Sequence, residues 1–540
     1  MRIEFFKTYN EIHTWTGIVS GLFLFICFLT GSLTMLKAPL NQWALQPQSS
    51  LPEIPRHAYD DLIQKVYSAH PEATADMTVY LPHSFPQIAP LVWKVENPDT
   101  HQQALWAASL SPQGDLIAQQ VAESNVGEFF DHLHRTAGIP GGAGHDAIGT
   151  YVMGIVAAVY FVALVSGLIV FLPTWFKDFL TLRRGENRKR FWLDFHNVLG
   201  ISALPFHLVI ALTTVVFAYH DLMYDSLQSW VYKETPMFDR PAPKAGMDAS
   251  QLASLDELAL GIQRLEPEFA MAEVRLAGIG TPRAMAVVGG DLYGQWVRGP
   301  DYAYAVSNPY TAQPGYTAML PSQSGFMGKV VNGLFTLHFG GFGGDTVKWI
   351  YVLLGISGSL LFFTGNILWL ETRRKKQKRN QPAVSQTRSA VALARLTVGV
   401  CMGTMLGVVL TLLCVHWLPH HQFNIQLWQQ AAYYSGFLLA ILWAFLSTPM
   451  AAALGQLKAL CALLLLLAAS AAWQGLTADG DALDFAFAAC VAFVLCVMLW
   501  VLKHLLNRAP AITADSVWAI KPLSSTESPD INPMIVSPEK

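Results

Sequence analysis

The stretch that decides the fold is YNEIHTWTGIVSGLFLFICFLTGSL, residues 9–33, in which a histidine stands at the mouth of a long apolar run. Gly17 follows His13 by one helical turn. The apolar run, residues 15–36, is as long as the roughly 20 residues that cross a bilayer core. Taken alone, His13 is compatible both with a polar anchor at the membrane interface and with a metal ligand. The rest of the sequence must decide between them.

The composition indicates a polytopic membrane protein. Of 540 residues, 52% are hydrophobic and only 14% are charged, and the mean hydropathy of +0.34 is far from a soluble average. The sequence contains eight apolar stretches long enough to span a bilayer: 15–36, 150–172, 198–219, 347–370, 393–418, 429–448, 454–473 and 483–502. The sixth has a short apolar core, so a re-entrant or interfacial helix is the alternative there.

The distribution of basic residues predicts the orientation in the membrane. Residues 177–190 and the segment ETRRKKQKRNQ at 371–381 are rich in Lys and Arg, which places both in the cytoplasm. Segment 37–147 has twelve acidic and five basic residues and is expected outside. Eight spans then leave both termini cytoplasmic. We therefore expect a multi-pass protein of the bacterial inner (cytoplasmic) membrane, whose first helix is retained because no A-x-A cleavage site follows it.

Several kinds of chemistry have no support in the sequence. All six cysteines lie in apolar runs and none forms a C-x-x-C motif, which argues against iron–sulfur, zinc and dithiol sites. No P-loop, Rossmann glycine fingerprint, H-E-x-x-H or G-x-S-x-G motif is found. Nucleic acid is not expected as a partner, and no nucleotide or flavin site is evident. The lipid bilayer is the one partner that the composition implies directly.

An internal repeat covers the first two thirds of the chain. HTWTGIVSGLFLFICFLTG at 13–31 aligns with HNVLGISALPFHLVIALTT at 196–214, and EFFDHLHRTAGIPGGAG at 128–144 resembles NGLFTLHFGGFGGD at 332–345. Between them, DDLIQKVYSAHPEA matches DELALGIQRLEPEF, each an amphipathic helix followed by strand-like runs: DMTVYL and LVWKV, then AEVRL and AMAVV. Residues 1–370 therefore read as two parallel copies of one unit, related by a pseudo-two-fold axis along the membrane normal.

The predicted fold class is a polytopic α-helical membrane protein. It has a duplicated four-helix core, two periplasmic α+β modules and four additional C-terminal transmembrane helices. The expected domains are: transmembrane helix 1 at 1–37; periplasmic module 1 with a following helix at 38–147; transmembrane helix 2 and a basic cytoplasmic loop at 148–195; transmembrane helix 3 at 196–220; periplasmic module 2 with a following helix at 221–345; transmembrane helix 4 at 346–371; a cytoplasmic linker at 372–392; the C-terminal extension at 393–508; and a disordered cytoplasmic tail at 509–540.

Four histidines recur in both copies and are the candidate ligands. A two-fold axis brings His13 opposite His196 at the cytoplasmic face, and His134 opposite His338 at the periplasmic face. Two facing imidazoles without a carboxylate or thiolate suit a haem iron, whose other four ligands come from the porphyrin. Gly17 and Gly200, which follow the first pair by four residues, would let the helix backbone approach a flat macrocycle. Two haem b groups are predicted.

His207 offers an alternative. It lies eleven residues after His196, and so on nearly the same helix face and roughly 16 Å deeper in the membrane. An intramembrane ionisable residue is a functional candidate, and His207 could ligate the periplasmic-side haem in place of an outer histidine. It could equally be a polar packing group beside Pro205. Its repeat equivalent is Leu24, which excludes a symmetric role.

The combination of motifs resembles a known family. EIHTWTGIVSG, HLHR before a span, FWLDFHNVLG and LHFG are similar to the PepSY-associated transmembrane-helix family, which includes PiuB-like iron-regulated membrane proteins and FoxB-type ferrisiderophore reductases. The resemblance covers about residues 1–375. It implies two PepSY-like periplasmic modules, haem between the four core helices, and reduction of ferric siderophores on the periplasmic side. The matching histidines are His13, His134, His196 and His338.

The resemblance leads to an expected function of haem-dependent ferric (ferrisiderophore) reductase in iron acquisition. Siderophores hold ferric iron more tightly than ferrous iron because hard anionic oxygens prefer the higher charge, so one electron would release ferrous iron for uptake. The electron donor, a quinol or a cytoplasmic reductase, is not identified, and neither are catalytic residues. Two alternatives remain open: a non-enzymatic PepSY-type sensor or regulator, and a transporter of iron–siderophore or another solute.

Overall fold

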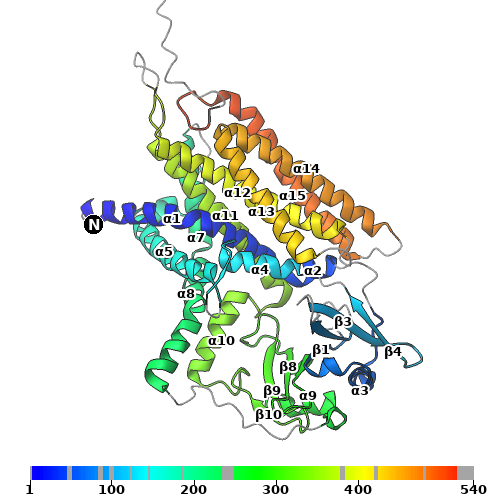
Figure 1. The fold of residues 1–540 in the computed structure, drawn as a ribbon. Coiled ribbons are helices and arrows are strands. Elements are labelled where there is room, and N and C mark those ends of the chain that lie inside the picture. Colours follow the sequence, from blue (N-terminus) through cyan, green and yellow to red (C-terminus); the bar gives the residue numbers. More distant parts are fainter. Residues whose placement is uncertain are drawn as a thin grey trace, which may run out of the picture.

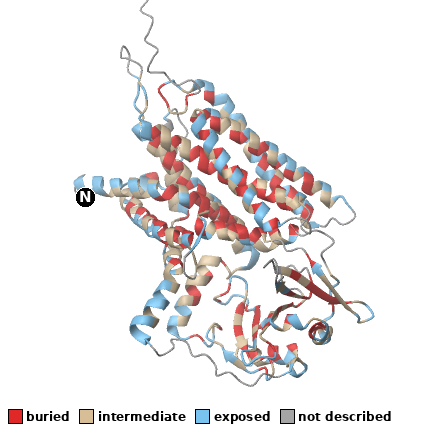
Figure 2. Ribbon diagram, in the orientation of Figure 1, coloured by how far each residue is buried: buried red, intermediate tan, exposed pale blue. Residues whose placement is uncertain are grey.

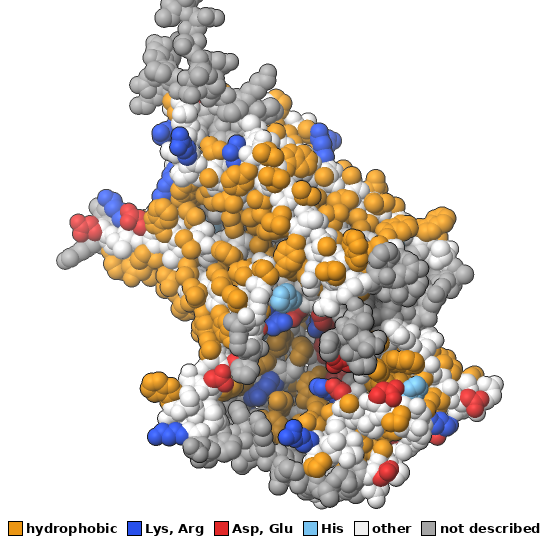
Figure 3. Space-filling model, in the orientation of Figure 1, with side chains coloured by type: hydrophobic (Ala, Val, Ile, Leu, Met, Phe, Trp, Pro, Cys, Tyr) orange, Lys and Arg blue, Asp and Glu red, His pale blue; other side chains and the backbone are white. Residues whose placement is uncertain are grey.

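The chain folds into a long helical bundle that lies against one large β-sheet (Figure 1). The computed structural model describes residues 3–44, 51–82, 89–96, 103–121, 125–143, 146–183, 187–233, 248–377, 384–418, 424–477 and 482–519. Aliphatic and aromatic side chains cover the bundle, whereas charged side chains concentrate around the sheet and at the ends of the helices (Figure 3). This distribution is that of a membrane-embedded bundle carrying a water-exposed domain.

In the part of the chain that the structure describes, seven helices are long and apolar enough to cross a membrane. These candidate spans are Glu4–Thr34, Ile148–Asp178, Leu204–Tyr232, Gly344–Arg373, Arg388–Trp417, Pro449–Gly475 and Ala482–Ala511. The eighth predicted span falls in helix α13 (Ile425–Leu446), which is 22 residues long but outside the seven. It packs along α12 (Arg388–Trp417) and α14 (Pro449–Gly475). The sixth apolar stretch is therefore a full helix of the bundle, and its weaker hydropathy matches its polar first turns.

The third predicted helix is two helices. We expected one helix over residues 196–220, but α7 (Arg188–Ser202) ends at Ser202 and α8 (Leu204–Leu227) begins at Leu204. Pro205 explains the break, because it cannot donate a backbone hydrogen bond to the preceding turn and is favoured at a helix start. At the equivalent position α1 (Ile3–Thr34) has Leu22 and continues unbroken. His196 therefore lies on α7, outside the third span.

Two modules of the same construction form the sheet. Module 1 comprises α3 (Tyr59–Ala69) and strands β1 (Asp76–Tyr80), β2 (Leu91–Glu96), β3 (Gln103–Leu110) and β4 (Leu116–Val121). Module 2 comprises α9 (Leu255–Gln263) and strands β7 (Ala270–Ala277), β8 (Met285–Asp291), β9 (Ala303–Ser307) and β10 (Pro314–Tyr316). The four strand runs noted in the sequence are all strands. Alternating burial along β1 and β9 shows that one sheet face packs on the helices.

The first strands of the two modules pair, which makes one sheet of eight strands in the order β10-β9-β8-β7-β1-β2-β3-β4. β1 and β7 are antiparallel, with Thr78 opposite Arg275. Because the strand order reads the same outward from this seam, the sheet has the pseudo-two-fold arrangement that the repeat predicts. Arg275 adds an ion pair to Asp76 across the seam. A shared core under the sheet includes residues of both modules, such as Leu62 and Leu258.

Short helices connect the modules to the membrane bundle. They are α2 (Lys37–Trp43) and α4 (Val126–Thr136) in the first half, and α10 (Phe326–Phe339) in the second. α4 leads into α5 (Ile148–Phe171), and α10 leads into α11 (Gly344–Arg373). α1, α5 and α8 pack in turn, and α1 also packs along α11, so the four core spans form one cluster. Buried residues concentrate where these spans meet, whereas the far ends of α8 and α10 are largely exposed (Figure 2).

The C-terminal extension consists of α12, α13, α14 and α15 (Ala482–Arg508), which lie side by side in Figure 1. The expected tail at 509–540 needs correction, because residues 509–519 fold back onto the segment after α11. Although burial opposes it, hydrogen bonds from Thr513, the Gln377 amide and Arg374 lower the pKa of Asp515 to about 2. The remainder of the predicted tail, residues 520–540, lies outside the described residues.

Candidate functional site

The structure brings the rings of His13 and His196 together. Their ring centroids are 6.1 Å apart, with an interplanar angle of 65°. His13 lies on α1, and His196 comes from α7. We call these two residues the distal pair, because they lie far from the sheet.

In both halves of the molecule, the Nδ1 of the distal histidine forms a hydrogen bond with a membrane span. The Nδ1 of His13 lies 2.8 Å from the carbonyl oxygen of Ala163 on α5. The Nδ1 of His196 lies 3.2 Å from the hydroxyl of Thr364 on α11, and this hydroxyl donates to the carbonyl of Leu361 at 2.9 Å. Each imidazole is therefore fixed by the other membrane span of its own repeat, the second span for His13 and the fourth span for His196.

A glycine makes room for each distal ring. A Cβ added at Gly167 would lie 2.8 Å from the Cε1 and Nδ1 atoms of His13, and one at Gly365 would lie 3.4 Å from the Cε1 of His196. Ser166–Gly167 and Thr364–Gly365 occupy the same place in α5 and α11. The sequence analysis missed this second repeated motif, because its spacing of 198 residues differs from the 183 of the first spans.

His134 and His338 also meet, and we call them the proximal pair. Their ring centroids are 6.3 Å apart, at an interplanar angle of 44°. His134, on α4, places its Nδ1 2.9 Å from the carbonyl oxygen of Cys27. His338, on α10, places its Nδ1 2.7 Å from the hydroxyl of Thr213. His13 precedes Cys27 on α1 by 14 residues, so the two pairs are separated by about 21 Å along that helix.

The hydrogen bonds define which nitrogen is free on each ring. A carbonyl oxygen only accepts, so the Nδ1 atoms of His13 and His134 carry the hydrogen and donate it. The Thr364 and Thr213 hydroxyls donate their hydrogens to backbone carbonyls of their own helices. Each hydroxyl oxygen therefore accepts a hydrogen bond from the Nδ1–H of its histidine. In all four rings this assignment leaves the Nε2 lone pair available, which is the arrangement of a metal-bound histidine.

The spacing of the rings fits a metal between them. With metal–imidazole bonds of about 2 Å and ring nitrogens about 1 Å from their centroids, a bridged pair has centroids roughly 6 Å apart. Among the described residues, no group of three or more His, Cys, Asp or Glu side chains could hold a bare metal ion. Pairs of imidazoles instead suit an iron that already has four other ligands, as in haem. The donor set and its spacing therefore fit the predicted cofactor.

The two predicted haem-packing glycines have free space beside them. A Cβ at Gly17 would meet no atom within 4 Å, and one at Gly200 would meet only the Cδ1 of Leu361, at 3.5 Å. Protein packing therefore does not require glycine at these positions. Contact with a macrocycle stays a prediction for both.

His207 is not brought to either pair. It is fully buried, and among the described residues no ring contact joins it to another histidine. Its neighbours are the rings of Phe206, Phe28 and Tyr160, with centroids 5.5, 5.6 and 6.1 Å away. Within the same part of the chain, neither nitrogen of His207 has a hydrogen-bond partner. The structure thus favours the symmetric pairing of His134 with His338 over the alternative ligand.

An ion cluster anchors α7 close to the distal pair. Asp194, 1% exposed, accepts hydrogen bonds from the side chain of Arg183 and forms an ion pair with Arg190, and both arginines also bind Asp178 at the end of the second span. Hydrogen bonds to Asp194 and Asp178 raise the pKa of Arg183. Because Asp194 is two residues from His196, this cluster fixes the helix that carries one distal ring.

The side chain of Arg298 lies close to the proximal pair, separated from it by two phenylalanine rings. The guanidinium of Arg298 is 5.9 Å from the centroid of Phe335, which packs on Phe217, and Phe217 packs on His338 at 4.9 Å. The Nε of Arg298 is buried and has no hydrogen-bond partner among the described residues. The nearby carboxylate of Asp301 is paired with Lys348 instead.

The face of the molecule between bundle and sheet is hollowed, and basic and acidic side chains line the hollow (Figure 3). Two acids of module 2 have raised pKa values. Burial raises the pKa of Glu273 and of Asp291, and repulsion from Asp301 adds to both shifts.

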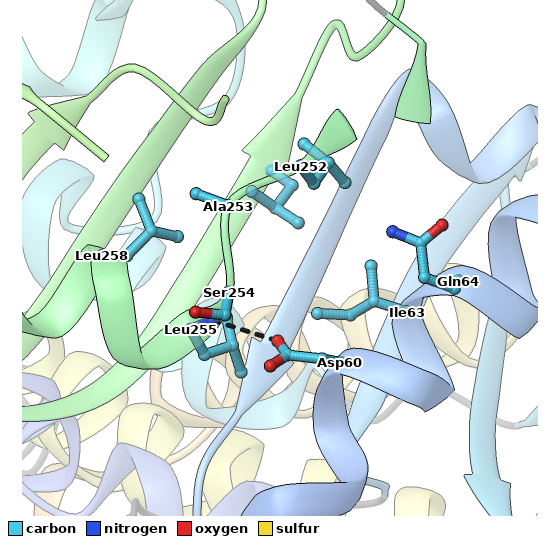
Figure 4. A pocket seen from close by; sticks show the side chains of 9 residues that line it. Asp60, Ile63, Gln64, Leu252, Ala253, Ser254, Leu255 and Leu258 are labelled. Atoms are coloured by element: carbon cyan, nitrogen blue, oxygen red, sulfur yellow. Dashed lines mark hydrogen bonds between the residues drawn. The ribbon is translucent and has the colours of Figure 1, made fainter. Parts of the chain in front are cut away.

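A pocket of about 100 Å³ lies elsewhere, at the seam between the modules (Figure 4). It is lined mainly by aliphatic side chains, including Ile63 and Leu258. Its one carboxylate, Asp60, accepts a hydrogen bond from the backbone N–H of Leu255 at the start of α9. The pocket lies where α3 and α9 pack together, and its carboxylate is already used in a hydrogen bond between the two modules.

Comparison with known proteins gives a match over the two thirds of the chain that carry both histidine pairs. A family model described as PepSY-associated TM region matches residues 11–372. The match includes both histidine pairs and both modules and ends in the last turn of α11. A search of curated proteins finds no match to the chain.

Proposed function

Because the chain belongs to the PepSY-associated TM region family, we propose that it is a dihaem electron-transfer protein that reduces a ferric siderophore on the sheet side of the membrane. The observation that carries this proposal is the pairing of all four duplicated histidines, each with Nδ1 bound to the protein and Nε2 free. Haem b bound at each pair would supply a one-electron couple.

The protein's own residues would orient and insulate the two centres. The carbonyls of Ala163 and Cys27 and the hydroxyls of Thr364 and Thr213 fix the tautomer and direction of the four rings, as groups behind metal-bound histidines do. Phe28, the residue after Cys27 on α1, packs on Tyr160, Phe206 and Phe362 in a buried aromatic cluster. That cluster would keep water out of the core of the four spans. The electron donor would be a quinol or a cytoplasmic reductase.

The sheet side supplies a place for an anionic substrate. Siderophore chelates hold ferric iron through hard anionic oxygens. The guanidinium of Arg298, whose Nε has no hydrogen-bond partner among the described residues, is suited to carboxylates and other planar anions. Lys348, near the entrance to α11, adds a second basic group, although it is partly neutralised by Asp301. A non-enzymatic regulator would account for the sheet but would leave the four paired histidines without a role.

An absorption spectrum of the detergent-purified full chain tests the proposal. We expect a Soret band and an α band that sharpen on reduction, and a haem-to-protein ratio near two. His196→Ala and His338→Ala should each lower that ratio to near one, whereas His207→Ala should leave it unchanged. A protein without a reducible haem spectrum contradicts the proposed function. Loss of a haem in His207→Ala alone contradicts the pairing.

A further inference from the structure

The four C-terminal helices lie beyond the segment that the family match covers, and they pack against α11 of the second half and against several helices of the first half of the core. α12 and α13 contact α4, α12 contacts α1, and α15 contacts α2. Together with α2 and α4 they form one hydrophobic core that includes Trp43, Phe130 and Leu133 on one side and Leu406 and Leu460 on the other. The helix that carries His134 is therefore part of the core of the C-terminal bundle.

α4 is fixed to its surroundings at both ends. At its start, Asn41 of α2 accepts from the Gly127 amide and donates to Glu128. α2 is itself held by Trp43, whose ring stacks on Phe487 at 3.8 Å and on His416 at 5.3 Å. The C-terminal bundle thus holds the first turn of α4 through α2.

The other end of α4 is held directly. The hydroxyl of Tyr434, on α13, donates to the carbonyl of Gly138 at 3.0 Å, four residues after His134. The ring of the adjacent Tyr433 packs edge-on against Phe129 at 5.7 Å. These two tyrosines contact α4 on both sides of the histidine.

The turn that Tyr434 holds needs support. Ala137 has a φ of +50°, in the left-handed region that costs a residue with a Cβ about 1 kcal/mol. Gly138 follows with a φ of +77°. In the second half, the residue that caps α10 is Gly340, with a φ of +68°, which adopts this conformation at no such cost. The first half therefore has the more strained turn and an added hydrogen bond to it.

The second half has its own tyrosine. The hydroxyl of Tyr351, on α11, donates to the carbonyl of Leu337 at 2.6 Å, next to His338. At the corresponding depth α5 has Met153, which cannot donate a hydrogen bond. The two proximal histidines are thus each supported by a tyrosine hydroxyl, one from within the repeat and one from the C-terminal bundle.

We propose that the C-terminal bundle is a brace for the proximal pair, and that Tyr434 is a positioning residue that holds the end of α4 so that His134 faces His338. In the first half, the hydrogen bond from Tyr434 takes the place of the hydrogen bond that Tyr351 makes in the second half. The spectroscopic test of this proposal rests on the proposed function, because the test observes the proximal haem.

The test is Tyr434→Phe in the full-length chain, which keeps the ring and removes the hydroxyl. We expect a shift in the midpoint potential and low-spin resonance of one haem only, the one lost in His338→Ala, and roughly tenfold weaker retention of that haem. Tyr433→Phe is the matched control, because it keeps the ring against Phe129 and changes a hydroxyl that does not bond α4. Tyr351→Phe should shift the midpoint potential of the same haem, because Tyr351 supports His338.

A second readout does not depend on haem. Without the hydrogen bond to Gly138, amide hydrogen exchange in residues 134–140 should be roughly fivefold faster in Tyr434→Phe, and unchanged in Tyr433→Phe. If wild-type protein contains no haem, the proposed function fails while this measurement still decides the brace. Identical exchange and identical haem properties in Tyr434→Phe and wild type would overturn the brace, whatever the function.

Discussion

The two histidine pairs have nearly the same ring spacing but are built differently. In the distal pair, one ring binds the Ala163 carbonyl and the other binds Thr364, whose hydroxyl donates to Leu361, the repeat equivalent of Ala163. A hydroxyl residue followed by glycine, Ser166–Gly167 or Thr364–Gly365, is present behind each ring. The distal pair is therefore symmetric in its supports as well as in its histidines.

The proximal pair has the same carbonyl and hydroxyl contacts but less symmetric surroundings. Its rings stand on short helices outside the spans, and the glycine behind His134, Gly31, where a Cβ would lie 2.7 Å from the ring, is replaced by Thr214 in the second copy. α4 is anchored to the C-terminal bundle, whereas α10 is anchored to module 2, since Thr336 donates to the Val297 carbonyl at 2.7 Å. Supports can thus diverge after duplication while the histidines stay, and they have diverged on the side of the sheet.

The largest effect is expected at the distal glycines. In Gly167→Ala the new Cβ would lie 2.8 Å from two atoms of His13 and push the ring off the Ala163 carbonyl. We expect loss of one haem per chain, with the proximal haem unchanged. Gly365→Ala, where the contact is 3.4 Å, should weaken the same haem only partly. Haem stoichiometry and redox titration measure both, and equal losses from the two pairs would show that the supports are not separate.

A smaller effect is expected from the hydroxyl that supports His338. Thr213→Val keeps the shape of the side chain but leaves the Nδ1–H of His338 without its acceptor, at a cost of about 1–3 kcal/mol. The proximal haem should change its midpoint potential and be retained about tenfold less tightly. Thr30→Val is the repeat-equivalent comparison, because the Thr30 hydroxyl bonds the carbonyls of Ile26 and Cys27 and, among the described residues, does not contact a histidine ring directly. Equal changes in the two variants would argue against a specific role for Thr213.

The difference between the pairs also explains how far the sequence could predict the site. The four histidines were found because each repeat segment keeps a constant spacing within itself. Gly167 and Gly365 were not predicted, because loops of unequal length give the second and fourth spans a repeat spacing that differs from that of the first and third spans. No sequence pattern linked Tyr434 to the site, since it lies 300 residues from His134 in a region without a repeat.

The same limits apply to the fold. Apolar run length predicted the membrane helices, because crossing a bilayer sets a minimum length. The pairing of β1 with β7 into one sheet could not be predicted, since strand runs carry no information about which partner lies at their edge. Pro205 was visible in the sequence, but whether it bends a helix or divides it depends on the packing around it.

The smallest effect is expected at Arg298, and it separates substrate binding from haem binding at the proximal side. Arg298→Gln removes a cation that has no acceptor among the described residues. If it meets the anionic oxygens of a ferric chelate, KM for that chelate should rise about fivefold, with kcat and both haem spectra unchanged. Lys329→Gln, an exposed cation on the same helix as His338, is the control and should change KM less than twofold. A shifted potential of the proximal haem in Arg298→Gln, without substrate, would instead assign the guanidinium to a haem carboxylate. The asymmetry of the proximal side would then serve the cofactor and not the chelate.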